Sequence, residues 1–206
     1  MKNNQNDKKW FPAKYVSRFL NLHSAEDLMS IMQCSNTLKE ITESMGMYYC
    51  VTDKICSYDD TIDLKKEDSV GIFVFGDGVL PRTGAIFAYL TKWNVWSLDP
   101  LMKKHKDIKR LFSENITAEK FIELNKIEIF SEDTVILIFP HSHVADVNRI
   151  YKAFSTKKVW IINMPCCNPG QCNSLKLHGL TYHDKDIMSE KNKIQLFCNY
   201  KELKFV

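Results

Sequence analysis

Val70-Gly71-Ile72-Phe73-Val74-Phe75 is followed directly by Gly76-Asp77-Gly78, so a short apolar run ends in a glycine-rich turn. Such a run, bounded by turn residues, is typical of a strand that is buried on both faces of a parallel sheet. Pro81 comes shortly afterwards and suits the first position of a helix, where its missing amide hydrogen is not needed. The segment therefore predicts a strand, a tight turn and a helix, the repeating unit of α/β proteins.

The rest of the chain extends this unit, because apolar runs and amphipathic segments alternate as far as residue 163. Two alternating runs joined by the polar stretch 184–192 then predict a terminal antiparallel hairpin. Together they predict an α/β fold with a doubly wound, seven-stranded mixed sheet. Strands are expected at 70–75, 94–98, 127–130, 134–139, 158–163, 179–183 and 193–198, and helices at 81–93, 101–112, 117–125 and 144–154.

The region before the first strand has a different pattern. Apolar residues fall at helical spacing over 13–47, which predicts two or three helices, and the acidic, polar residues 53–68 indicate a linker. Residues 1–68 are therefore expected to form an N-terminal helical extension and linker, and residues 69–206 a Rossmann-like domain, in one compact unit overall.

Composition limits the class of protein. With 206 residues and 45% hydrophobic content, the chain is long enough to bury one sizeable core. The formal charge of +3 creates no strong overall field toward nucleic acid or membranes, and no apolar run approaches the ~20 residues that cross a bilayer. Seven cysteines without regular spacing indicate a reducing compartment. We expect a soluble, cytoplasmic protein with free thiols and no membrane partner.

The glycine turn predicts a nucleoside pocket. In doubly wound sheets, ligands bind beyond the carboxyl ends of the strands, where backbone amides and a helix start are available. Asp99 ends the second strand and follows Asp77 by 22 residues, close to the ~20 residues at which an acidic group reaches a ribose hydroxyl. The alternative is that Gly76 and Gly78 only make a tight turn and that Asp99 only caps the next helix.

These residues resemble a known family. Phe75-Gly76-Asp77-Gly78 and Ser97-Leu98-Asp99-Pro100 are similar to the first two motifs of class I S-adenosylmethionine-dependent methyltransferases, and the resemblance extends over about residues 70 to 200. In that family the glycine turn holds the methionine part of S-adenosylmethionine, and the acidic residue after the second strand holds the ribose. The resemblance implies these roles for the Phe75 to Gly78 turn and for Asp99.

The chain departs from the family pattern after the turn. The family has another glycine two residues on, whereas here Val79 to Thr83 intervenes before Gly84. Arg82 and Thr83 stand at a helix start, where they could offer a cation and a hydroxyl to a carboxylate or phosphate. The alternative is that Arg82 is simply solvated and Thr83 is a helix-start residue.

Two further turns end at the same edge of the predicted sheet. Pro140-His141-Ser142-His143 follows the fourth strand, where the resembled family presents groups to the cofactor and to the methyl acceptor. His141 and His143 are the candidate catalytic residues, since imidazoles serve as acid or base near neutral pH; the alternative is that they are ordinary loop residues. Pro165-Cys166-Cys167 follows the fifth strand, and the two turns together resemble a subset of methyltransferase-like proteins, some of which act on transfer RNA.

A metal site is not expected. Cys166, Cys167, Cys172 and His178 carry groups that suit zinc, but adjacent cysteines rarely chelate one tetrahedral ion, and no Cys-x-x-Cys pair is present.

The leading hypothesis is methyl transfer from S-adenosylmethionine, with RNA as the favoured acceptor. A local basic surface is the reason for RNA, although the same charges are often a solvated helix face. One alternative is a binding or scaffold protein that keeps the fold without cofactor chemistry. Another is a nicotinamide-dependent enzyme, which the glycine spacing fits less well. The basic surface would comprise Lys8, Lys9, Trp10, Lys14, Arg18 and residues 103–110.

Overall fold

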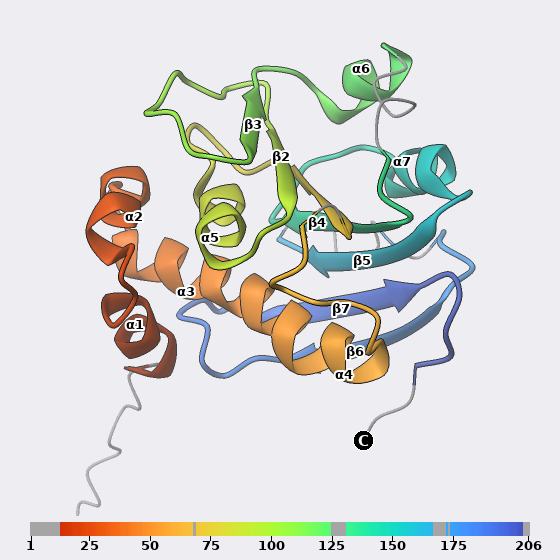
Figure 1. Ribbon diagram of the computed structural model, residues 1–206, viewed down its shortest axis with the longest axis horizontal. Helices are drawn as coiled ribbons and strands as arrows, with labels where there is room; N and C mark the ends of the chain where they lie inside the picture. Colours follow the sequence, from red (N-terminus) through yellow and green to blue (C-terminus); the bar gives the residue numbers. More distant parts are fainter. Residues whose placement is uncertain (1–12, 68, 125–130, 167–171, 173, 204–206) are drawn as a thin grey trace, which may run out of the picture.

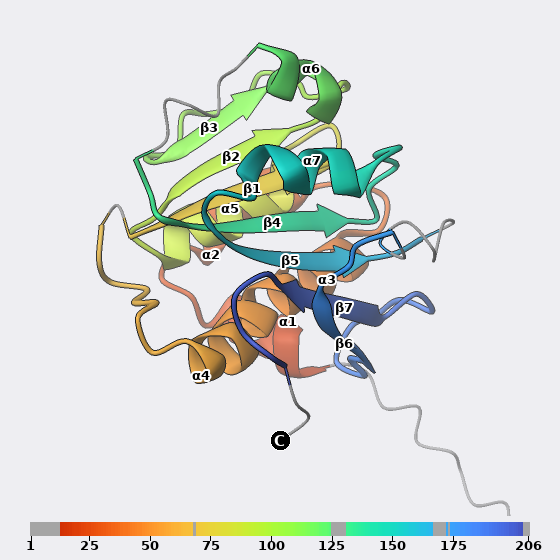
Figure 2. The same ribbon diagram turned by 90° about the vertical axis from the view of Figure 1, so that its right-hand side faces the viewer.

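A computed structural model describes residues 13–67, 69–124, 131–166, 172 and 174–203. Its centre is a seven-stranded sheet with the strand order β3-β2-β1-β4-β5-β7-β6 (Figures 1 and 2). The first five strands run parallel, and β7 pairs antiparallel with both β5 and β6. The doubly wound mixed sheet with a closing hairpin is thus confirmed. The strands are β1 (Val70–Phe75), β2 (Asn94–Leu98), β3 (Leu111–Glu114), β4 (Thr134–Pro140), β5 (Lys158–Met164), β6 (His178–His183) and β7 (Lys193–Cys198).

Helices cover both faces of the parallel strands (Figures 1 and 2). On one face lie α6 (Ala118–Glu123) and α7 (Val147–Phe154); on the other lie α1 (Ala13–Leu20), α2 (Ala25–Met32), α3 (Thr37–Cys50) and α5 (Arg82–Leu90). Because successive side chains of a strand point to opposite faces, Ile72 packs with the N-terminal helices and Phe73 with α6 and α7. This explains why all six residues of β1 are apolar or glycine and buried.

The N-terminal helices belong to the same hydrophobic core as the sheet. Tyr15 of α1, Leu28 of α2 and Ile41 of α3 are buried in one cluster with Ile72 and Trp160. The end of α3 runs on without a break through the π-helical turn η1 (Val51–Ile55) into α4 (Cys56–Tyr58). The predicted linker boundary at residue 53 is therefore wrong, since η1 keeps Val51 and Ile55 buried in the core. Among the described helices, none combines the length and apolarity needed to span a bilayer.

The helix predicted at residues 101–112 is also wrong. Residues 102–110 have no regular structure, and Leu111–Glu114 form the edge strand β3, paired with β2. Arg110 ends this segment with a φ of 66°, outside the right-handed helical region, and its guanidinium donates hydrogen bonds to the carbonyls of Ala88 and Thr91. Pairing with the sheet therefore outweighed the helical spacing. The strand predicted at 127–130 lies outside the described residues.

The segment between β6 and β7 lies against α3. The amide of Met188 donates a hydrogen bond to Thr42 Oγ1 at 2.8 Å. Ile187 approaches Gly46 so closely that a Cβ on this glycine would stand 2.5 Å from Ile187 Cδ1. Both contacts hold the segment beside α3, next to the carboxyl ends of the parallel strands.

Candidate functional site

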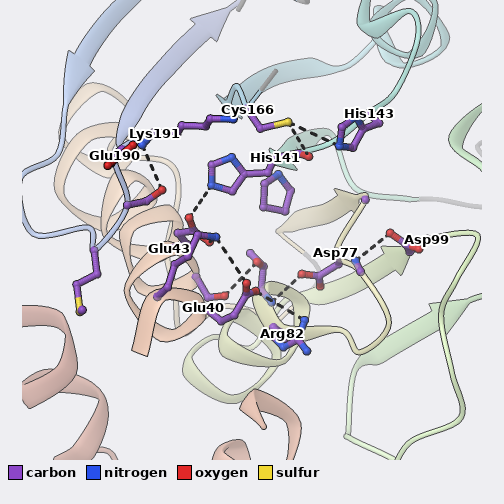
Figure 3. Close-up of a pocket in the computed structure, with 18 residues that line it drawn as sticks. Glu40, Glu43, Asp77, Arg82, Asp99, His141, His143, Cys166, Glu190 and Lys191 are labelled. Carbon is purple, nitrogen blue, oxygen red and sulfur yellow. Dashed lines mark hydrogen bonds and ion pairs between the residues drawn. The ribbon is translucent and has the colours of Figure 1, made fainter. Parts of the chain in front are cut away.

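The carboxyl ends of β1, β2, β4 and β5 open onto a cleft of about 780 Å³ (Figure 3). Helix α3 and residues 188–191 supply other parts of its lining. The cleft brings together nine of the ten cofactor-binding and catalytic residues predicted from the sequence. The tenth, Phe75, is fully buried and stacks on Phe139 in the core. The nine are Gly76, Asp77, Gly78, Arg82, Thr83, Asp99, Pro140, His141 and His143.

The two glycines of the turn have different surroundings. Gly76 and Gly78 have φ angles of 81° and 85°, in the left-handed region that favours glycine. A Cβ on Gly76 would lie 2.8 Å from Ser142 Oγ, whereas a Cβ on Gly78 would meet only Arg82 Nη1, at 3.6 Å. Gly76 is therefore required by packing, and Gly78 presents bare backbone to the cleft.

Asp99 faces this turn from the neighbouring strand. Its Oδ2 accepts a hydrogen bond from the amide of Gly78 at 2.9 Å, and its Oδ1 accepts one from the amide of Leu101 at 2.7 Å. The residue is 8% exposed and lines the cleft. Because each carboxylate oxygen can accept two hydrogen bonds, both oxygens retain acceptor capacity for a ligand.

The carboxylate of Asp77 makes its hydrogen bonds inside the protein. It accepts hydrogen bonds from the amides of Thr83 and Gly84, at 2.9 and 2.8 Å, and from Ser97 Oγ at 2.8 Å. Burial raises the pKa of Asp77 above its usual value, although these hydrogen bonds act in the opposite direction. Asp77 thus ties the turn to the start of α5 and to β2, and its side chain is not available to a ligand in this arrangement.

Gly84, the next glycine after the turn, has a packing role that the sequence alone did not indicate. A Cβ there would stand 3.0 Å from both Ser97 Cβ and Leu111 Cδ1. Close packing of helix on strand is the role of the third glycine in dinucleotide-binding turns. The chain therefore has a glycine for this purpose, six residues after Gly78 and not two residues after it as in the family pattern.

Arg82 and Thr83 face α3. Arg82 Nη1 lies 3.6 Å from Glu40 Oε2, and Arg82 Nε is buried without a hydrogen-bond partner among the described residues. The hydroxyl of Thr83 lies 3.2 Å from that of Ser44. Arg82 therefore places a cation in the cleft beside the glycine turn, while Thr83 holds α5 to α3.

His141 is paired with a glutamate from α3 (Figure 3). Its Nε2 lies 2.6 Å from Glu43 Oε1, and Lys39 Nζ lies 2.7 Å from Glu43 Oε2. Burial alone would raise the pKa of Glu43, but the hydrogen bonds and charges of His141 and Lys39 hold the pKa below its usual value. The carboxylate can only accept, so the imidazole donates through Nε2.

The backbone of His141 is in an uncommon conformation. Its φ of 52° lies in the left-handed region, which is sparsely occupied by residues other than glycine, with histidine among the more frequent exceptions. Strain of this kind is found most often at functional sites.

The turn after β5 brings a thiol to the same cleft. Cys166 Sγ lies 3.7 Å from His143 Nε2 and 3.5 Å from the carbonyl oxygen of His141. Cys172 is buried in the core beside α6 and α7, His178 begins β6, and Cys167 lies outside the described residues. Within the described part of the chain, no group of three or more His, Cys, Asp or Glu side chains is arranged to hold a metal ion.

A second pocket, of about 480 Å³, adjoins the cleft beyond Asp99. Its walls come from the segments after β2, β3 and β4, and it shares Gly76, Asp99, His141 and His143 with the cleft. The additional lining residues are mostly apolar or small: Leu98, Pro100, Leu101, Thr117, Ala118, Glu119, Ser142, Val144 and Ala145.

Sequence reasoning did not identify the contribution of α3, which provides Lys39, Glu40 and Glu43. One signal was present. From residue 44 to Cys50 the chain has no charged residue, which is typical of a helix buried on most of its faces. A glutamate at the edge of such a run is a candidate for a buried, paired carboxylate.

Several described residues of the proposed basic surface make contacts with other side chains of the protein. Lys14 pairs with Asp186 at 3.1 Å, and Lys106 with Asp27 at 3.0 Å. The guanidinium of Arg18 lies over the ring of Tyr49, 4.2 Å from its centre. Lys103, Lys104 and Lys109 are exposed. Lys8, Lys9 and Trp10 lie outside the described residues.

No family model and no curated protein matches this chain. Solved structures to which the chain is distantly similar include MtNAS in complex with MTA and tNA, at 9% identity, covering 91% of this chain and 75% of that chain with a TM-score of 0.46. Another is the fibrillarin/Nop5p complex, at 11% identity, 79% and 82% coverage and a TM-score of 0.45. A third is the MycE methyltransferase with Mg and SAH, at 11% identity, 79% and 55% coverage and a TM-score of 0.42.

Identities of 9 to 11% and TM-scores of 0.42 to 0.46 mark distant likenesses. The α/β fold with its seven-stranded mixed sheet rests on the strand order described above.

Proposed function

We propose that this protein is an S-adenosylmethionine-dependent methyltransferase. One observation carries the proposal: the carboxylate of Asp99, at the tip of β2, faces the amide of Gly78, in the turn after β1, at 2.9 Å on the wall of a cleft. A carboxylate with remaining acceptor capacity beside a glycine turn is suited to a ribose, because the carboxylate accepts hydrogen bonds from hydroxyls.

The surrounding residues fit the cofactor. Asp99 would bind the ribose hydroxyls, and the Gly76 to Gly78 backbone would bind the methionine part. The guanidinium of Arg82, which lines the cleft, would pair with the carboxylate of the cofactor. The less polar pocket beyond Asp99 would take the base. When bound, the cofactor supplies an activated methyl group.

The residues at the end of β4 would act on the methyl acceptor. Glu43 holds the imidazole of His141 through Nε2, so the ring has a fixed orientation and tautomer. We assign His141 and His143 to the acceptor side of the cleft, where His141, held by Glu43, orients the acceptor and the exposed His143 receives its proton. Most of the rate enhancement would come from proximity and orientation.

RNA remains the proposed acceptor, on a narrower basis than the sequence indicated. Lys103, Lys104 and Lys109 are exposed in the segment that follows Asp99, so a polyanion bound there would reach the same side of the molecule. Binding of transfer RNA should then weaken steeply with added salt, because phosphate contacts release counterions. Salt-independent or absent binding in a fluorescence anisotropy titration would remove RNA as the acceptor.

Calorimetric titration tests the function itself. S-adenosylmethionine and S-adenosylhomocysteine should both bind with a stoichiometry of one, whereas NAD should not bind. Absence of binding by both sulfur ligands would support a scaffold protein that keeps the fold without the chemistry. Binding of NAD alone would support a nicotinamide-dependent enzyme.

A further inference from the structure

The six described cysteines differ in their access to solvent. Cys50, Cys172 and Cys198 are buried, and burial raises the pKa of each of these thiols. Burial also raises the pKa of the half-buried Cys56, to about 11. Such thiols react slowly, because the thiolate is the nucleophile. Among the described thiols this leaves Cys34, which is exposed, and Cys166, which is half-buried but lines the cleft.

Cys166 differs from Cys34 in its neighbours. It follows β5 and lines the cleft, and because β4 and β5 are adjacent parallel strands, it meets the histidine turn that follows β4. Figure 3 shows dashed lines from its sulfur to the imidazole of His143 and to the backbone carbonyl of His141. The distances are 3.7 Å to His143 Nε2 and 3.5 Å to the oxygen. A nucleophile within reach of a base is the usual arrangement for an activated thiol.

His143 and the carbonyl of His141, both among the described neighbours of the sulfur, affect the thiol differently. A carbonyl oxygen can accept the thiol hydrogen but cannot remove it, and it would repel a thiolate held at rest. The imidazole of His143 can take the proton away. The arrangement therefore favours a thiol that stays protonated until an electrophile arrives and is then deprotonated by His143.

We propose that Cys166 and His143 form a nucleophilic thiol site that bonds to soft carbon electrophiles entering the cleft. In the reaction, the sulfur forms a bond to the electrophilic carbon while the bond from that carbon to its leaving group breaks. The electron pair of the broken bond departs with the leaving group, and the thiol proton passes to His143 Nε2. Within the proposed function, on which this last identification rests, the methyl group of a sulfonium is such an electrophile, and the product would be S-methylcysteine.

Iodoacetamide labelling followed by peptide mass spectrometry tests the site. At pH 7 the folded wild-type chain should be carbamidomethylated at Cys166 at least about tenfold faster than at Cys34, the internal reference. His143→Ala and His143→Gln should each remove this difference, whereas His183→Ala, which removes an imidazole bonded to Asn192 on the terminal hairpin, should preserve it. Equal rates at Cys166 and Cys34 in the wild type, or an unchanged ratio in both folded His143 variants, would overturn the proposal.

Labelling in the presence of S-adenosylhomocysteine distinguishes this proposal from the methyltransferase proposal. S-adenosylhomocysteine should protect Cys166 but not Cys34, because only Cys166 lines the cleft among these two thiols. Fast, His143-dependent labelling without protection would leave the thiol site intact and would count against cofactor binding in the cleft. Protection of Cys166 with labelling no faster than that of Cys34 would support cofactor binding in the cleft and overturn the thiol site.

Discussion

Asp99→Ala is the substitution that most directly tests the proposed pocket. In the folded protein the carboxylate accepts two backbone hydrogen bonds, from Gly78 and Leu101. Each is worth about 1 to 1.5 kcal/mol here, since both amides lie beside a cleft where water can replace the lost partner. The substitution should therefore destabilise the free protein by about 2 to 3 kcal/mol, or about 4 to 12 °C in Tm for a chain of this length.

The effect on binding adds to this loss of stability. A charge-assisted hydrogen bond to the ribose contributes about 1.5 to 3 kcal/mol, so the Kd for S-adenosylhomocysteine should rise roughly 10- to 150-fold. Thermal unfolding measures the first effect, and calorimetric titration well below the Tm measures the second.

Glu119→Ala provides a matched control, because it also removes one carboxylate from the adjoining pocket. Asp99→Asn keeps one carbonyl oxygen as an acceptor, so its Tm should lie between those of the wild type and Asp99→Ala. An affinity of Asp99→Ala equal to that of Glu119→Ala would refute the assignment of Asp99 to the ribose. An unchanged Tm would refute the assigned role of its carboxylate in holding the turn.

Two other predictions concern the turn and the C-terminal segment. Gly76→Ala should lower the free energy of unfolding by more than Gly78→Ala. Both variants suffer left-handed backbone strain of about 1 to 2 kcal/mol, but only the Cβ at residue 76 adds a contact of 2.8 Å with Ser142. Equal losses of free energy in urea unfolding would contradict this packing. The buried carboxylate of Asp59 accepts hydrogen bonds from Tyr200 and Thr61. Burial acts to raise the pKa of Asp59, but these hydrogen bonds hold the pKa below its usual value of 3.8. Asp59→Asn should thus lower the free energy of unfolding by about 1 to 3 kcal/mol at pH 7. The difference from wild type should shrink as the pH falls below about 4, because Asp59 becomes protonated. A difference that does not depend on pH would contradict the ionised carboxylate as the source of stability.

The elements that the sequence predicted well are those in which burial leaves a regular pattern. β1 and β2 begin and end at the predicted residues, and the terminal hairpin pairs as expected. Strands covered on both faces are apolar throughout, and this composition is visible without knowledge of the partners. The approach of Gly78 to Asp99 follows from the same logic, because adjacent parallel strands end at one edge of the sheet.

The prediction failed where contacts distant in the sequence decide the structure. The spacing over residues 101–112 suits a helix, but Leu111–Glu114 gain more from pairing with β2 along the sheet edge. The charges of Lys14, Arg18 and Lys106 suggested a free basic surface. Folding instead brings each of them next to a partner, an aspartate for the two lysines and the ring of Tyr49 for Arg18.

The chain's own order of residues therefore determined the strand-turn-helix unit and the placement of a carboxylate opposite a glycine turn, because both depend on local pattern and on the geometry of parallel strands. Only the tertiary structure decided that Asp77 turns inward, that Glu43 reaches His141 across 98 residues, and that Cys166 lies beside His143. The physical reason is that hydrogen-bond partners are chosen by proximity after packing, and packing brings together residues whose separation in the sequence carries no signal.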